Sequence, residues 1–230
     1  MNERGGTTER AEFWAQLTDE ERADLRASGA VRRWSRREIL FHEGGASDLV
    51  LVVLAGRFKV SSHTAGGVEA VLAVRGPGSL VGELGVIDGS PRSATVQALD
   101  DLTALTLAPD RFEAYLQRWP RVSLLLLRMV TSRLRDADRK RVEFGALDAG
   151  RRVASRLVEL AEKFGRTADG ADVRLDLPVS QDELASWTGV SRAAVNKALS
   201  LLRARGWIST GRMNITLHDV PALRHYAEDA

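Results

Sequence analysis

The stretch GPGSLVGELGVIDGSPRSATV, residues 76–96, places Glu83 and Arg92 among glycines and small apolar residues. An unpaired buried charge is strongly unfavourable, so each of these side chains needs a partner or a ligand. A planar guanidinium can bind two phosphate oxygens, and glycines let backbone N–H groups approach an anion closely. The stretch therefore predicts either an anion-binding cradle or a salt bridge between Glu83 and Arg92.

A second stretch, SQDELASWTGVSRAAVNKALSLLRARGW, has the spacing of two short helices joined by a tight turn. Ser180 and Glu183 form a capping box, and Gly189 stands where a sharp turn needs a positive φ. Ser191 is placed to cap the second helix. The inner faces are expected to carry Leu184, Ala185 and Trp187, and then Val195, Ala198, Leu199 and Leu202. This spacing predicts a helix-turn-helix.

The outer face of that second helix carries polar and basic side chains that can read DNA. Near a helix N-terminus such side chains reach base edges, and arginine pairs bidentately with guanine. The residues WISTGRMNITLHD that follow predict two short strands around a Thr-Gly turn, which is a winged addition; the alternative is a solvated helical hairpin. The predicted DNA-binding residues are Ser180, Ser191, Arg192, Ala193, Asn196 and Lys197.

The elements before this motif change period along the chain. Residues 11–28 have a helical pattern, with Thr18 and Glu21 spaced as a capping box. From Val31 to Leu107, short apolar segments recur about every ten residues between Gly, Pro, Asp and Ser clusters. This spacing predicts a β-barrel or sandwich of about eight strands.

A long helix is expected from Pro120 onward. Its apolar seam suggests a coiled-coil-like dimer contact, although the helix could instead pack on its own barrel. A charged outer face favours the dimer. The seam is Leu127, Val130, Leu134, Ala137, Arg141 and Phe144, and the outer face is Arg133, Arg135, Asp136, Arg139 and Lys140. Residues 144–148 look like a hinge, with Asp148 available to cap the next helix.

Composition narrows the class of protein. The 230 residues are 44% hydrophobic and 28% charged, which is typical of a globular protein, and there is no cysteine for disulfides or thiolate chemistry. The four histidines never fall at i, i+4, so no metal site is expected. From Trp119 on there are 19 basic and 14 acidic residues, net +5, against 14 and 17, net −3, before it. No stretch reads as a membrane span or a secretory signal, so a cytoplasmic protein is the simplest interpretation.

In this order, these parts resemble the cyclic-AMP receptor/FNR (CRP/FNR) family of bacterial transcription regulators, from about Phe13 to Tyr226. SRAAVNKAL resembles the recognition helix of actinobacterial members. The resemblance implies an α+β fold with an N-terminal cyclic-nucleotide-binding β-barrel of jelly-roll type, a long dimerisation helix and a C-terminal winged helix-turn-helix. The corresponding segments are residues 1–118, 119–145 and 146–230.

The resemblance also implies roles for the first stretch, which corresponds to the family's phosphate-binding cassette. Arg92 would bind the cyclic phosphate and Glu83 the ribose 2′-OH, with Ser93 and backbone N–H groups completing the cradle. The implied ligand-binding residues are Gly82, Glu83, Leu84, Arg92, Ser93, Ala94, Ala137 and Asp138.

Two departures from the family pattern bear on specificity. Ala137 and Asp138 stand where cAMP-binding members have a threonine and then a serine or asparagine. Asp138 either accepts a hydrogen bond from a base edge or pairs with Arg135 or Arg141 on the helix surface. In the recognition helix, Ala193 stands where many members have glutamate, so the preferred operator should differ.

The expected function is a homodimeric transcription regulator on palindromic double-stranded DNA, gated by cAMP in preference to cGMP. No cofactor, membrane or enzymatic activity is expected: GELG lacks the lysine of a P-loop, and no Ser/His/Asp order stands out. RNA polymerase is a further partner to consider. One alternative is a regulator of the same fold whose cassette is vestigial, and another is a non-DNA-binding regulatory module of a signalling enzyme.

Overall fold

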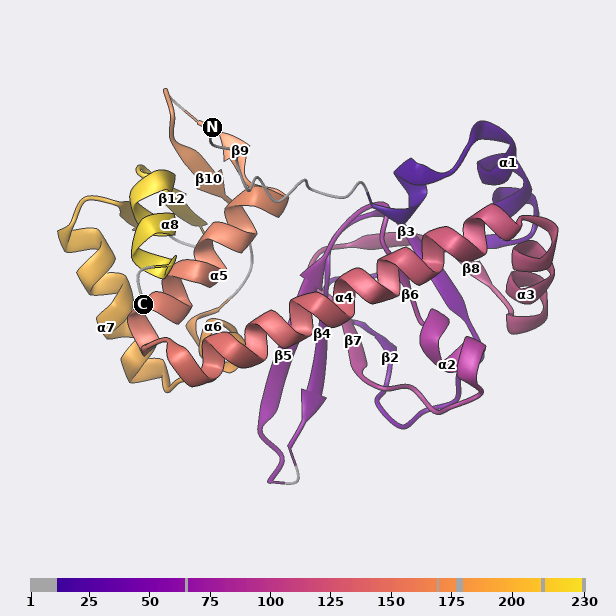
Figure 1. Ribbon diagram of the computed structural model, residues 1–230, viewed down its shortest axis with the longest axis horizontal. Helices are drawn as coiled ribbons and strands as arrows, with labels where there is room; N and C mark the ends of the chain where they lie inside the picture. Colours follow the sequence, from indigo (N-terminus) through magenta and orange to yellow (C-terminus); the bar gives the residue numbers. More distant parts are fainter. Residues whose placement is uncertain (1–11, 65, 169, 177–179, 212–213, 229–230) are drawn as a thin grey trace, which may run out of the picture. The chain divides into compact units, whose positions relative to one another are not determined.

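The computed structural model describes residues 12–64, 66–168, 170–176, 180–211 and 214–228 (Figure 1). The chain divides into two compact units, Met1–Val60 with Val74–Arg133, and Ser61–Ala73 with Leu134–Ala230. The division falls inside the long helix. The three segments proposed from the sequence therefore remain a prediction.

Residues 30–107, most of which lie in the N-terminal unit, form eight strands in two four-stranded sheets, which confirms the predicted count of about eight (Figure 1). The sheet orders are β1-β8-β3-β6 and β2-β7-β4-β5. The strands are β1 Ala30–Trp34, β2 Ile39–Phe41, β3 Val50–Ala55, β4 Phe58–His63, β5 Glu69–Arg75, β6 Leu80–Val81, β7 Thr95–Ala98 and β8 Leu102–Leu107.

Strand β3 shows how this arrangement follows from the sequence. Val50 and Val52 pack in one apolar cluster, whereas Leu51 and Val53 pack in another, because successive side chains of a strand point to opposite faces. All four residues are fully buried. A continuous apolar run is therefore what a strand covered on both faces requires.

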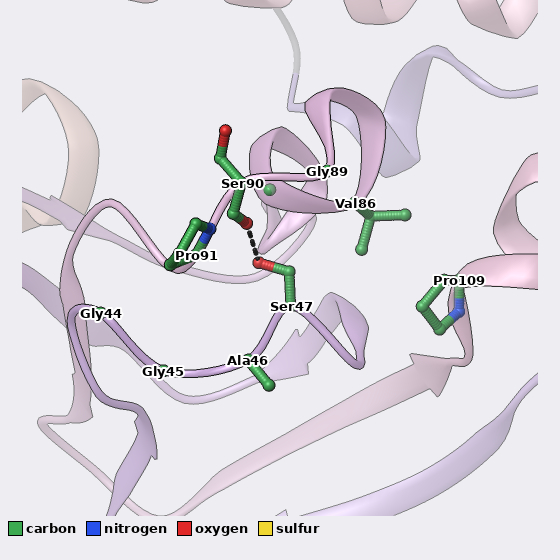
Figure 2. Close-up of a pocket in the computed structure, with 10 residues that line it drawn as sticks. Gly44, Gly45, Ala46, Ser47, Val86, Gly89, Ser90, Pro91 and Pro109 are labelled. Carbon is green, nitrogen blue, oxygen red and sulfur yellow. Dashed lines mark hydrogen bonds between the residues drawn. The ribbon is translucent and has the colours of Figure 1, made fainter.

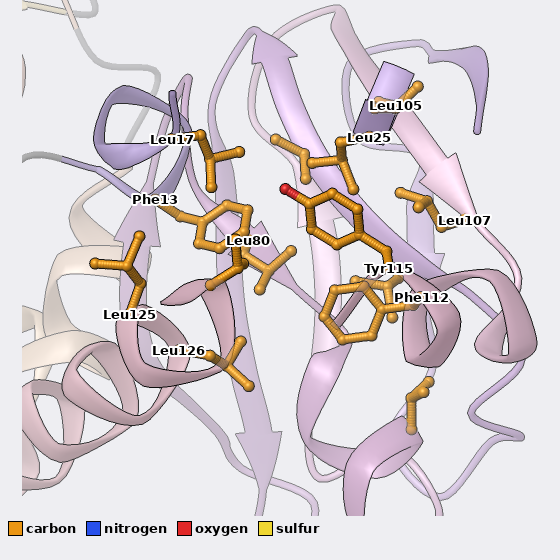
Figure 3. Packing of buried hydrophobic residues seen from close by; sticks show 14 residues of the cluster. Phe13, Leu17, Leu25, Leu80, Leu105, Leu107, Phe112, Tyr115, Leu125 and Leu126 are labelled. Atoms are coloured by element: carbon orange, nitrogen blue, oxygen red, sulfur yellow. The ribbon is translucent and has the colours of Figure 1, made fainter. Parts of the chain in front are cut away.

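Helices cover the first of these clusters (Figure 3). They are the 3₁₀ helix η1 Phe13–Gln16 and the α-helices α1 Asp19–Ala27, α2 Glu83–Asp88, α3 Pro109–Arg118 and α4 Pro120–Ala146. The helical pattern of residues 11–28 is thus two elements, and the capping box of Thr18 and Glu21 begins the second. Phe112 and Tyr115 of α3 and Leu126 of α4 lie in the cluster, so the first turns of α4 belong to the core of this unit.

The C-terminal unit contains the helices α5 Ala149–Phe164, α6 Gln181–Thr188, α7 Arg192–Ala204 and α8 Val220–Glu228. Its sheet has the order β11-β12-β10-β9, with β9 Arg166–Thr167, β10 Val173–Leu175, β11 Ile208–Gly211 and β12 Asn214–Leu217. The antiparallel pair of β11 and β12 confirms the predicted wing. The predicted hinge at residues 144–148 is shorter in the structure, because residues 144–146 belong to α4 and only residues 147–148 separate it from α5. The predicted cap is confirmed, because the Asp148 side chain accepts from the Arg151 N–H at 2.9 Å.

The turn between α6 and α7 is the one that the sequence predicts. Gly189 has φ 62°, and a Cβ there would lie 2.7 Å from the ring of Phe144, so both the backbone and the available space require glycine. All the residues expected on the inner faces of α6 and α7 are buried. In the described parts of the chain, no helix combines the length and the apolar character needed to cross a membrane.

Candidate nucleotide cassette and nucleic-acid interface

The cassette begins at Gly82, which precedes helix α2. Its φ is 88°, and a Cβ would lie 2.7 Å from Nη1 of Arg92 and 2.8 Å from the carbonyl oxygen of Leu49. No larger residue fits such a close approach without a shift. Gly82 therefore brings the start of α2 against the Arg92 guanidinium.

Arg92 is only 5% exposed and donates hydrogen bonds within its own chain. Nε donates to the carbonyl of Ala46 at 3.1 Å, Nη1 to that of Gly82 at 2.9 Å, and Nη2 to that of Leu49 at 2.7 Å. Nη2 also lies 3.3 Å from Asp48 Oδ1, an exposed carboxylate. The guanidinium is thus held mostly by neutral carbonyls.

The surroundings of Arg92 are apolar on one side. Its guanidinium carbon lies 3.7 Å from the centre of the Phe41 ring, which is a cation–π contact. Burial lowers the pKa of Arg92, and Asp48 opposes that shift. The group keeps its charge because an arginine pKa starts far above neutrality.

Glu83 is 1% exposed and pairs with Arg133 of α4. Arg133 also donates from Nη2 to the carbonyl oxygen of Leu80 at 2.7 Å. The predicted alternative of a salt bridge between Glu83 and Arg92 is therefore wrong for this structure, since each side chain has different partners. Arg133 itself was placed on the charged outer face of the helix, and it points inward instead.

Sequence reasoning missed Arg133, although a signal was present. The buried stripe of α4 includes Leu126 and the partly buried Met129, and Arg133 lies seven and four residues beyond them. Residues at these spacings share a helix face. An arginine that continues an apolar stripe is therefore a candidate for pairing with a buried carboxylate.

The other predicted ligand residues lie in different settings. Leu84 is 42% exposed, Ser93 is exposed, and Ala94 is buried. Ala137 and Asp138 are exposed residues of the C-terminal unit, whereas Glu83 and Arg92 belong to the N-terminal unit. Among the described residues Asp138 has no ion-pair partner, whereas Asp136 pairs with Arg139 at 3.1 Å. The predicted pairing of Asp138 with Arg135 or Arg141 is not found.

A pocket of about 340 Å³ lies beside the cassette, between the loop at residues 44–47 and the loop that follows α2 (Figure 2). Ser47 Oγ donates to the carbonyl oxygen of Ser90 at 2.8 Å and joins the two loops. None of the residues that line the pocket is charged, and neither Glu83 nor Arg92 is among them: Gly44, Gly45, Ala46, Ser47, Gly85, Val86, Gly89, Ser90, Pro91 and Pro109. The pocket alone therefore cannot bind a phosphate by charge.

The nucleic-acid interface is presented by capped helices. Ser180 begins α6 with the predicted capping box, and Ser191 begins α7 by accepting from the Ala194 N–H at 3.2 Å. The side chains of α7 expected to read bases are all exposed: Arg192, Ala193, Asn196 and Lys197. Arg192 lies 3.4 Å from Asp182 of α6.

A cluster of buried charges joins α4 to α5 within the C-terminal unit. Arg156, 5% exposed, pairs with both Glu143 and Glu159, while Lys140 and Lys163 lie 3.4 and 2.9 Å from Glu159. Burial lowers the pKa of Lys140 to about 8. The pKa of Glu159 is lowered to about 2: burial, which would raise it, is outweighed by Lys140, Lys163 and Arg156.

This cluster also corrects the placement of Lys140, which was assigned to the charged outer face of the long helix. Its Nζ lies 3.3 Å from the carbonyl oxygen of Leu72 and 5.7 Å from the ring centre of Trp187. Lys140 follows Arg133 by seven residues on the same face. The inward stripe of α4 therefore changes from apolar to basic without leaving its face.

A Ser/His/Asp arrangement that sequence order did not reveal lies on the winged sheet. His218 Nε2 is 3.0 Å from Ser209 Oγ, and His218 Nδ1 is 2.8 Å from Asp172 Oδ2. Such a trio has the connectivity of a hydrolytic triad. Ser209 is exposed, and here the three side chains cross-link neighbouring strands at the sheet surface. No group of three or more His, Cys, Asp or Glu side chains among the described residues is arranged to hold a metal ion.

Two family profiles match this chain: the cyclic nucleotide-binding domain over residues 31–118 and the Crp-like helix-turn-helix domain over residues 151–226. The chain is 30% identical to a CRP-like cAMP-activated global transcriptional regulator of Mycobacterium tuberculosis over 192 residues, covering 84% of this chain and 85% of that protein. It is 28% identical to the cyclic AMP receptor protein of Thermus thermophilus, over 90% of this chain and 93% of that protein.

Solved structures agree on the fold. The FixK2 structure from Bradyrhizobium japonicum matches with a TM-score of 0.78 at 21% identity, covering 88% of this chain and 98% of that one. The CRP/FNR proteins that this chain matches are transcription regulators and not enzymes. On the barrel with its cassette, the winged helix-turn-helix and these similarities, the chain belongs to the CRP/FNR family of DNA-binding transcription regulators.

Proposed function

We propose that the protein is a homodimer whose DNA binding is gated by a cyclic nucleotide in the cassette, with cAMP preferred over cGMP. The observation that carries this proposal is that Glu83 and Arg92, the two charged cassette side chains, are both buried and held by groups that a nucleotide can replace. The relatives from M. tuberculosis and T. thermophilus, whose names refer to cAMP, support the same ligand.

Arg92 would bind the cyclic phosphate by exchanging acceptors. A charged phosphate oxygen is a stronger acceptor for a guanidinium than a neutral carbonyl. The nucleotide would therefore take over donors that now serve the carbonyls of Gly82 and Leu49. Ser93, exposed next to Arg92, would add a hydroxyl donor to the same phosphate.

Glu83 would accept from the ribose 2′-OH at the position where it now pairs with Arg133. Base choice must come from elsewhere, because every cyclic nucleotide has the same ribose and phosphate. Ala137 has no side-chain donor, and Asp138 can only accept when ionised. Its carboxylate would accept from the adenine amino group, or from N1–H and N2–H₂ of guanine. We expect weaker binding than in members that keep the threonine.

The dimer would form along helix α4. Leu127 and Leu134 are each 61% exposed, seven residues apart on this helix, which is an unusual exposure for two leucines on one face. A second copy of the chain would cover them. Each dimer then presents two recognition helices to half-sites about 34 Å apart on palindromic DNA.

The test is calorimetric titration of cAMP and cGMP into the wild type, Arg92→Ala and Ser93→Ala, with and without operator DNA. Ser93→Ala changes an exposed residue, so it separates loss of binding from loss of folding. Binding to the wild type that weakens in both variants is expected. DNA affinity should rise with nucleotide by the same factor by which DNA strengthens nucleotide binding.

A vestigial cassette is the second candidate function. It is favoured by the hydrogen bonds of Arg92, which occupy Nε, Nη1 and Nη2 with partners from its own chain. The regulator would then bind DNA constitutively or respond to another ligand. No heat with either nucleotide at about a millimolar, together with unchanged DNA affinity, would decide for this candidate.

A further inference from the structure

Arg192 differs from Lys197, the other basic side chain of the recognition face, in forming an ion pair within the chain. Its Nη1 lies 3.4 Å from Oδ2 of Asp182, and both side chains are largely exposed, at 63% and 67%. In the described part of the chain no other acidic group pairs with Arg192. Neither Asn196 nor Lys197 makes a side-chain contact of this kind with a described residue, although both are exposed.

Both residues of this ion pair lie at helix N-termini that are capped by side chains. Asp182 is in the first turn of α6, whose start is held by the reciprocal capping box of Ser180 and Glu183. Arg192 is the first residue of α7, which the Ser191 side chain caps. The turn at Gly189 fixes the two helices against each other. The Asp182–Arg192 pair therefore links the first turn of α6 to the first residue of α7.

We propose that Asp182 is a positioning residue for base reading by Arg192. By engaging one Nη of the guanidinium, Asp182 directs the remaining donors as a pair toward the O6 and N7 acceptors of guanine. Asp182 lies in the first turn of α6 beside Arg192. Its negative charge therefore also repels DNA phosphates, whatever the base sequence. Asp182 thus weakens binding to every sequence and sharpens the choice of guanine. The proposal rests on the helix-turn-helix reading DNA and does not depend on the nucleotide.

The ion pair also bears on the missing glutamate at position 193. Ala193 offers the bases only a methyl group, so the recognition helix itself carries no carboxylate next to Arg192. Asp182 supplies a carboxylate from the neighbouring helix. That carboxylate faces the arginine, which is why we assign it a role in positioning and not in direct recognition of cytosine.

The test compares Asp182→Asn, Asp182→Glu, Arg192→Ala and the double variant Asp182→Asn/Arg192→Ala on DNA. The operator is first obtained by selecting random duplexes with the wild type. Affinity is then measured for that operator, for a copy in which the guanine sensitive to Arg192→Ala is replaced, and for a random duplex. Glu162→Gln is the matched control, because it removes the same charge from the exposed pair of Glu162 with Arg224 in the same unit.

Asp182→Asn is expected to bind the random duplex about two- to fivefold more tightly and to lower the ratio of operator to substituted operator about two- to fivefold. Asp182→Glu should keep the wild-type ratio. In the Arg192→Ala background, Asp182→Asn should leave the ratio unchanged, and Glu162→Gln should leave it unchanged in the wild-type background.

An unchanged ratio in Asp182→Asn, while Arg192→Ala lowers it, would overturn the positioning role. The positioning role would also be overturned if Glu162→Gln lowered the ratio of operator to substituted-operator affinity as much as Asp182→Asn does. Such a result would mean that the effect comes from net charge alone. If the wild type selects no sequence at all, DNA reading by this motif fails and the inference fails with it. The result of the nucleotide titration has no bearing on these outcomes.

Discussion

Two groups of buried charges in this chain are built in opposite ways. In the cassette, the Arg92 guanidinium is surrounded by neutral carbonyls and one exposed carboxylate. At the junction of α4 and α5, Arg156 lies between two carboxylates, and Lys140 and Lys163 complete the cluster. Arg92 has one exposed carboxylate as its ionic partner, which a ligand anion can replace, whereas Arg156 is held by two largely buried carboxylates of its own chain. The first suits an exchangeable ligand and the second a permanent structural joint.

The largest effect is expected for Arg156→Met. Removing this guanidinium takes a partner from both Glu143 and Glu159, and breaking a buried ion pair from one side costs up to about 3–5 kcal/mol. Glu159 keeps Lys140 and Lys163, and Glu143 keeps Arg139. The free energy of unfolding of the C-terminal unit should fall by about that amount, measured by urea unfolding with hydrogen exchange in α5. A loss below about 1 kcal/mol would show that the junction is not a structural joint.

The next largest effect is expected in how the unfolding free energy of the C-terminal unit depends on pH, because Glu159 and Lys140 at the α4–α5 junction have shifted pKa values. The Glu159 pKa of about 2 lies below its ordinary 4.5, so the unfolded chain binds more protons between these values and stability falls as the pH drops through this window. The Lys140 pKa of about 8 lies below its ordinary 10.5, so stability should rise between pH 8 and 10.5. Each contribution is of the order of 3 kcal/mol at most.

Glu159→Gln and Lys140→Met are the variants that check this dependence. The first should flatten the acid limb and the second the alkaline limb, in urea unfolding series that follow the same unit. Arg156 and Lys163 are the other basic groups that act on both side chains. Acid and alkaline limbs that are identical in the wild type and both variants would contradict the shifts.

Arg92→Met sharpens the comparison from the side of the cassette. Without nucleotide, the variant leaves the carbonyls of Ala46, Gly82 and Leu49 without a donor, so we expect the N-terminal unit to lose about 2 kcal/mol of unfolding free energy. The loss should be smaller than for Arg156→Met, because no carboxylate is left buried. A larger loss would place Arg92 among the structural charges and favour the vestigial cassette.

Glu83→Gln should have the smallest effect on stability. A glutamine oxygen can still accept from Arg133, so the contact changes from charged to neutral at a loss of about 1 kcal/mol in urea unfolding. Nucleotide affinity should fall more than stability, because the ribose hydroxyl then has a weaker acceptor. Equal losses in both measurements would mean that Glu83 serves only to hold Arg133.

The sequence predicted local structure well because local rules determine it. The capping boxes at Thr18 and Ser180, the glycine turn at Gly189 and the cap at Asp148 each depend on a few adjacent residues. Partners far apart in sequence were not predicted. Arg133 reaches Glu83 across 50 positions, and a helical surface pattern alone does not reveal which charged residue has a buried carboxylate opposite it.

Arg92 in the cassette shows the same limit of prediction from sequence. An arginine at this position predicts a partner with two acceptor atoms, but it does not tell whether these are carbonyl oxygens or phosphate oxygens. Only the fold shows that Gly82 and Leu49 present their carbonyls to it. Likewise, the sequence around Lys140 does not distinguish it from an exposed lysine, and only the packing of α5 against α4 shows that it is largely buried.

The contact between Gly189 and Phe144 couples the side chains that these two positions can carry. Asparagine tolerates a positive φ, but a Cβ at position 189 would lie 2.7 Å from Cε1 of the Phe144 ring. A replacement of Gly189 therefore requires the Phe144 ring to move away or position 144 to carry a smaller side chain. The two positions, one in the turn of the DNA reader and one in the last turns of α4, are expected to change as a pair.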